Sequence, residues 1–263
     1  MLGKLIKYDL KNTQKFMCIF YSLCIVFAIF TRIFLNIENS LIFNIIGRIC
    51  SGTMIAMMAN IIINNLMRYW IRFKNNLFGD EAYLTHTLPV KKSSIYSSKF
   101  VSALISLFIG IVVIIIGLFI SYYSKENLEV VKNFLLPVAD IMNSSIVKIL
   151  FAFFFIFFLE AFCILESGYT GIILGHRMNN AKIGFSVLFG FLTYMATQTF
   201  AMIVLFISAL FNDGIMNLFH TVDVIDIDLF KTIIWISSFV YIVSIVVIYF
   251  VNIKLLKQGV NVD

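Results

Sequence analysis

Long apolar stretches alternate with short polar ones along the whole chain. Each apolar stretch is about twenty residues or longer, the length of helix that crosses the hydrocarbon core of a bilayer. They predict six transmembrane helices, at residues 16–35, 41–67, 100–123, 146–174, 183–211 and 232–253. A transmembrane β-barrel would show alternating segments of about ten residues instead. The pattern therefore predicts a single all-α polytopic membrane domain over residues 1–263.

The first fifteen residues carry a different pattern, that of an amphipathic helix. Its apolar face is formed by Leu2, Leu5, Ile6 and Leu10, and its polar face by Lys4, Lys7 and Lys11. A lysine-rich face opposite an apolar one is typical of a helix lying in the membrane interface. The plainer alternative is a basic anchor that only orients the first span.

Composition and charge agree with a membrane protein and give it an orientation. Hydrophobic residues make up 61% of the chain and charged residues only 13%, whereas soluble domains carry about 25% charged residues. Fourteen of the twenty Lys and Arg residues lie before the first span, after the second, fourth and sixth spans, or at the start of the third and fifth. Basic segments of this kind stay in the cytosol. The chain is therefore predicted to lie in the plasma membrane with both termini in the cytosol. Because orientation explains the net charge of +6, we do not expect nucleic-acid binding.

Several predicted spans contain polar or charged residues. These are Arg48, Asn60 and Asn64 in the second span, Glu160 and Glu166 in the fourth, and Thr197 and Gln198 in the fifth. Such side chains are costly against lipid, so we expect them to face other helices or a watery path. Gly168, Gly171 and Gly175 in the fourth span are spaced for close helix packing.

The two intramembrane acids admit two interpretations. Glu160 and Glu166 are separated by about 240° around a helix, so they do not share a face. Each either serves transport, as a proton relay or a site for a cationic substrate, or pairs structurally with a polar group on a neighbouring helix.

A polar, basic segment at residues 72–99 separates the second and third spans and is predicted to be cytosolic. The sequence predicts a turn at Gly79 and then a short helix with acids in its first turn. Leu88-Pro89 ends that helix, since proline disfavours helical geometry in the residue before it. A second helix is expected to start within residues 90–98 and feed the third span. The segment is interpreted either as a docking element for a partner or as an ordinary solvated loop.

Catalytic and nucleotide-binding motifs are missing from the sequence. It has neither a P-loop pattern nor an HExxH or GxSxG pattern. The four cysteines fall inside apolar segments without CxxC spacing, so neither a disulfide nor a metal site is predicted. We therefore expect a non-enzymatic chain that holds no cofactor itself.

Residues 78–90, FGDEAYLTHTLPV, resemble a segment typical of ABC-2-type permeases of Gram-positive bacteria, and the opening MLGKLIKYDLK resembles the start of those subunits. The resemblance implies one transmembrane half of an ABC exporter, paired with a second identical or paralogous permease and with two ATPase subunits that bind ATP and Mg. It makes the N-terminal helix an interfacial elbow and residues 212–231 an external re-entrant element. It assigns coupling to the ATPase to Phe78, Gly79, Asp80, Glu81, Tyr83, Leu84, Thr85, His86, Leu88 and Pro89.

The leading functional hypothesis is export of an amphipathic substrate, such as an antimicrobial peptide, a lipopeptide or a drug-like molecule. One alternative is a membrane immunity or sensor protein that transports nothing. Another is a proton-coupled carrier that uses Glu160 and Glu166.

Overall fold

The structure is a computed structural model that describes residues 2–37, 40–141, 144–212, 215–216 and 227–258. Its main helices are α1 (Leu2–Leu35), α2 (Leu41–Leu77), α3 (Ala82–Thr87), α4 (Lys92–Tyr122), α5 (Lys125–Ile141), α6 (Ile146–Gly175), α7 (Lys182–Ala209) and α9 (Ile227–Lys257). Six of them are long and apolar enough to cross a membrane: α1, α2, α4, α6, α7 and α9. In the described part of the chain, the predicted all-helical fold with six helices able to span a membrane is thus confirmed.

The chain divides into two compact units, residues 1–129 and residues 130–263. In unit 1, α1 packs along both α2 and α4, and α3 contacts α2. In unit 2, α6 packs along α7 and α9, and α7 also contacts α9. Each unit therefore contains three of the six long helices.

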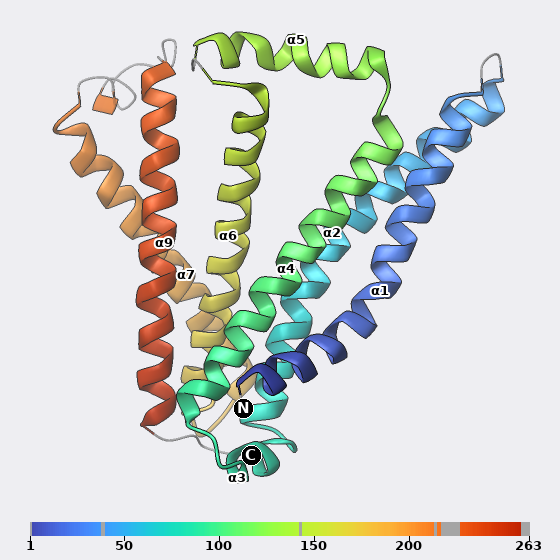
Figure 1. Ribbon diagram of the computed structural model, residues 1–263. Coiled ribbons are helices and arrows are strands. Elements are labelled where there is room, and N and C mark those ends of the chain that lie inside the picture. Colours follow the sequence, from blue (N-terminus) through green and yellow to red (C-terminus); the bar gives the residue numbers. More distant parts are fainter. Residues whose placement is uncertain (1, 38–39, 142–143, 213–214, 217–226, 259–263) are drawn as a thin grey trace. The chain divides into compact units, whose positions relative to one another are not determined.

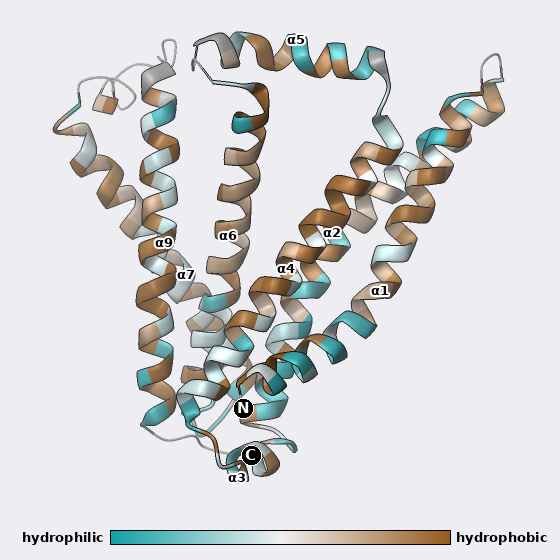
Figure 2. Ribbon diagram, viewed as in Figure 1, coloured by the Kyte–Doolittle hydropathy of each residue, from teal (hydrophilic) through white to brown (hydrophobic). Residues whose placement is uncertain are grey.

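Helix α1 joins the predicted amphipathic segment to the first span without a break. Its buried residues Asp9, Thr13, Met17, Cys24 and Ala28 form one stripe that crosses the predicted junction. In Figure 1 the N-terminal part of α1, in dark blue, runs in a different direction from the rest of the helix. The same part carries many hydrophilic residues in Figure 2, whereas the middle of α4 is mostly hydrophobic.

The basic segment after the second span is more helical than expected. Helix α2 continues to Leu77, ten residues beyond its predicted end at Met67. The predicted turn at Gly79 and the short helix after it are present as residues 78–81 and α3. Leu88 has an extended backbone, as expected before Pro89. Helix α4 begins at Lys92, which confirms that residues beyond the proline feed the third span.

Unit 2 is built on close contact between α6 and α7. A Cβ atom added at Gly171 would lie less than 3.0 Å from the backbone of Ser186 and Gly190, and one added at Gly175 would meet Ser186. Only glycine lets the two backbones approach so closely, as is common between membrane helices. The predicted packing role of these glycines is confirmed.

The connection between α4 and α6 contains a helix that the sequence analysis did not predict. Helix α5 spans 17 residues and includes Pro137. By contrast, most of the predicted re-entrant element, residues 212–231, lies outside the described residues.

Candidate functional site

Helix α3 presents exposed apolar side chains at its surface. Tyr83 is 76% exposed and Leu84 is 68% exposed, whereas Ala82 at the start of the helix is fully buried. Asp80 is also exposed, in the turn before α3. An exposed tyrosine beside a leucine is the kind of patch that fills a pocket on a protein partner.

Phe78 does not belong to this exposed patch, although we expected Phe78 and Tyr83 to dock together on the partner. Its side chain is 1% exposed and its ring lies 6.4 Å from the ring of Phe73 on α2. The prediction that the acids lie in the first turn of the helix is wrong, because Glu81 is the N-cap residue of α3 and Asp80 precedes it. Phe78 therefore anchors the turn to unit 1.

Polar contacts hold α3 to the end of α2, which in turn contacts α4. With its amide oriented to satisfy its neighbours, Asn76 Nδ2 donates to Glu81 Oε2 over 3.2 Å, and its Oδ1 accepts from Lys99 Nζ over 3.3 Å. At the other end of α3, a ring nitrogen of His86 lies 3.1 Å from the carbonyl oxygen of Leu77. Within α3, the Thr85 hydroxyl donates to the Glu81 carbonyl oxygen. The short helix is thus fixed at both ends.

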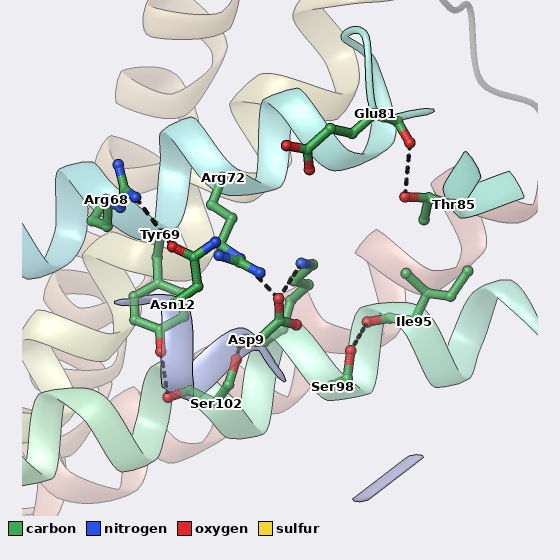
Figure 3. Close-up of polar contacts among 11 residues, drawn as sticks. Asp9, Asn12, Arg68, Tyr69, Arg72, Glu81, Thr85, Ile95, Ser98 and Ser102 are labelled. Atoms are coloured by element: carbon green, nitrogen blue, oxygen red, sulfur yellow. Dashed lines mark hydrogen bonds and ion pairs between the residues drawn. The ribbon is translucent and has the colours of Figure 1, made fainter. Parts of the chain in front are cut away.

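A buried ion cluster lies next to this attachment and joins three helices. Asp9 Oδ1 of α1 lies 2.9 Å from Arg72 Nε of α2 and 2.7 Å from Lys99 Nζ of α4. Figure 3 shows the Asp9 carboxylate facing Arg72, together with Glu81 at the N-cap of α3 and Thr85 within that helix. Asp9 is 5% exposed and Lys99 is 3% exposed. Charges buried this deeply are tolerated only when they are paired.

Further hydrogen bonds continue from the ion cluster along the same three helices. The Tyr69 hydroxyl donates to the Ser102 carbonyl oxygen over 2.8 Å. One turn farther along, Asn65 Nδ2 donates to the Ser106 carbonyl oxygen, and Gln14 donates to the Ser106 hydroxyl. These bonds connect α1 and α2 to α4 over several turns, so the end of unit 1 that carries α3 is cross-linked by polar groups.

The sequence analysis missed Asp9, although a signal was present. Asp9 follows Leu5 by four residues and Ile6 by three, so it falls on the apolar face of the amphipathic helix. An acid on such a face needs a cationic partner. In the structure Leu5, Ile6 and Leu10 are half-buried, while Leu2, Lys4 and Lys7 are exposed. Part of the face expected to enter the membrane interface therefore packs on the protein.

In unit 2, Glu160 on α6 is surrounded by neutral donors. The hydroxyl of Tyr194 and the amide of Gln198, both on α7, donate to Glu160 Oε1. Glu160 and Gln198 thus face each other between α6 and α7.

Glu166 points to a different group, as its position on the helix predicted. Its side chain is fully buried, and Asn252 Nδ2 on α9 lies 3.5 Å from its Oε2 atom. Thr197 is buried on α7, where its hydroxyl lies 3.7 Å from Cys163 Sγ. The two acids of α6 are thus held in separate polar surroundings.

The polar residues predicted from the second span behave differently. Arg48 Nε donates to Asn44 Oδ1 one turn before it, and Asn60 donates to the Ala56 carbonyl oxygen. Asn64 in turn donates to Asn60. These three residues bond within α2, whereas Asn65 on the same helix donates to α4. In the described part of the chain, no group of three His, Cys, Asp or Glu residues could hold a metal ion.

Comparisons with family models, curated proteins and solved structures find no match to this chain. Membership of the ABC-2-type permeases therefore stays a prediction.

Proposed function

We propose that this chain is the membrane subunit of an exporter driven by a separate ATPase, and that α3 is the helix that docks on the ATPase. The observation that carries the proposal is the exposed Tyr83–Leu84 pair on a short helix fixed at both ends. The resemblance of residues 78–90 to ABC-2-type permeases supports the same assignment. ATP and Mg are held by the partner, and a second permease copy or paralogue completes the transporter.

The contacts of α3 supply a route by which force on this helix would reach the membrane. Glu81 contacts Asn76, and Asn76 contacts Lys99. Lys99 is paired with Asp9 on α1. A push on α3 would therefore move the ends of α1, α2 and α4 together instead of bending a loop. Two discrete packings of such helices would alternately open the transporter to each side of the membrane.

The proposed orientation places both termini and α3 in the cytosol of a bacterial cell, with the multi-pass chain in the plasma membrane. The first turns of α1 form the interfacial elbow, because their exposed lysines suit an anionic membrane surface. The substrate is amphipathic, since α2 and α7 carry polar residues among apolar ones.

Capture of the ATPase by the solubilised full-length protein tests the proposal. We expect Tyr83→Asp and Leu84→Asp each to cost about 2 kcal/mol of binding, or roughly thirtyfold in affinity, as at interface hot spots. Asn75→Asp is the matched control, because it adds the same charge at an exposed position in the last turn of α2. Recovery of no ATPase with the unaltered chain would contradict the proposal.

Substitutions at Asp80 and Glu81 distinguish docking on the ATPase from the attachment of α3 to unit 1. Asp80→Lys changes an exposed charge in the turn, whereas Glu81→Lys also breaks the contact with Asn76. We expect Asp80→Lys to reduce ATPase capture without altering the stability of unit 1. Equal capture by Asp80→Lys and the unaltered chain would exclude Asp80 from the docking surface.

A further inference from the structure

Helix α5 (Lys125–Ile141) connects the end of α4 to the start of α6. Because α4 and α6 are both long and apolar enough to span the membrane, their connection lies at one membrane surface. The start of α5 is tied to α4: Asn127 Nδ2 donates to the Tyr122 carbonyl oxygen over 2.9 Å. Its other end is tied to α6, where Ala139 packs against Ile149.

The residues of α5 separate into an apolar and a polar face. At 100° per residue, Val130, Val131, Phe134 and Leu135 cluster on one side, and Glu126, Glu129, Lys132 and Asn133 fall on the other. The apolar side is not covered by the protein, since Val130 is 66% exposed and Phe134 is 78% exposed. A helix with such faces and charged residues is suited to the boundary between water and lipid.

Residues that flank α5 along the chain, on α4 before it and on α6 after it, are also apolar and exposed. Phe119 and Tyr123, at the end of α4, are exposed, as are Val147 and Phe151 in the first turns of α6. These residues belong to, or directly follow, membrane-spanning helices and therefore meet lipid. Aromatic residues such as Tyr123 are also enriched at the level of the lipid headgroups.

We propose that α5 is an interfacial helix that binds the membrane surface through Phe134, Val130 and Val131. Lipid acyl chains near the headgroups cover this face, while Glu129 and Asn133 face water. This inference does not depend on an ATPase partner.

Fluorescent labels on opposite faces of α5 test the assignment. Phe134→Cys and Glu129→Cys are made in a cysteine-free full-length chain, labelled with the same environment-sensitive maleimide and reconstituted into phosphatidylcholine–phosphatidylglycerol vesicles. Quenching is measured with lipids that carry a nitroxide near the headgroup and with aqueous iodide. We expect the label at 134 to be quenched at least twofold more by the lipid nitroxide, and twofold less by iodide, than the label at 129.

Equal iodide quenching at the two positions would overturn the proposal, because the apolar face would then be in water. Shielding of position 134 from both quenchers would also overturn it, since protein would then cover that face. Phe134→Trp in the chain with its native cysteines gives a second measurement if the cysteine-free protein does not fold. The added tryptophan emission, relative to the unaltered chain, is expected to be quenched by brominated lipids, and unquenched emission would contradict lipid contact.

Discussion

The two units hold their carboxylates in opposite ways. In unit 1, Asp9 lies between Arg72 and Lys99, both within 2.9 Å. In unit 2, Glu160 accepts hydrogen bonds from the neutral groups of Tyr194 and Gln198. Asp9 lies seven residues before the predicted start of the first span, whereas Glu160 lies well inside the fourth. The comparison indicates that fixed ion pairs support the helix ends and that neutral donors serve deeper in the membrane.

The units also differ in how their helices are joined. Side chains of α1 and α2 reach across to α4 through the bonds to Ser102 and Ser106. Helices α6 and α7 instead meet backbone to backbone at Gly171 and Gly175. Unit 1 is therefore expected to be sensitive to loss of charge pairing, and unit 2 to added volume.

Removal of the central carboxylate should have the largest effect. Asp9→Ala leaves the buried Lys99 and the partly buried Arg72 without their shared acceptor, and breaking a buried pair in this way costs about 3–5 kcal/mol. Thermal unfolding in detergent and the yield of folded protein measure the change in the free energy of unfolding.

Lys7→Ala is the control for Asp9→Ala, because Lys7 is exposed on the same helix. We expect its effect to stay within about 0.5 kcal/mol. Equal stability of the two variants would show that the ion cluster does not hold the three helices together.

Added volume at the contact of α6 and α7 should have the next largest effect. Gly171→Ala places a methyl group against the Ser186 and Gly190 backbones, and such overpacking costs about 1–3 kcal/mol. Gly184→Ala on α7 is the control, since nothing lies within 4 Å of its added Cβ. That control is expected to be neutral or stabilising by up to about 1 kcal/mol. If Gly184→Ala were destabilised and Gly171→Ala were not, the claim that unit 2 depends on close contact at Gly171 would be contradicted.

Neutralisation of the mid-helix acid should have the smallest effect. The Glu160→Gln side chain keeps an oxygen that accepts from Tyr194, so we expect a stability change below about 1 kcal/mol and transport close to that of the unaltered chain. Substrate uptake into inverted vesicles measures transport. Complete loss with a folded protein would favour the alternative of a proton-coupled carrier.

The sequence predicted the helices much better than the contacts among them. Continuous apolar runs and Leu88-Pro89 were enough to place the spans and the end of α3, because these features act locally. The burial of Phe78 depends on how the turn before α3 packs. The pairing of Asp9 depends on Arg72 and Lys99, which lie more than sixty positions away in the sequence. No local pattern identifies these contacts. Helix α5 was missed because its charges and Pro137 resemble those of a loop, although its two faces could have been recognised.

Cross-linking from Tyr83 tests the central claim most directly. A photoreactive phenylalanine analogue at position 83 is irradiated in membranes of cells that express the full-length protein, with the same analogue at the exposed position 75 as the control. The account predicts an adduct with an ATPase subunit from position 83 that is at least several times stronger than from position 75. An adduct with lipid or with another copy of this chain, and none with an ATPase, would contradict it.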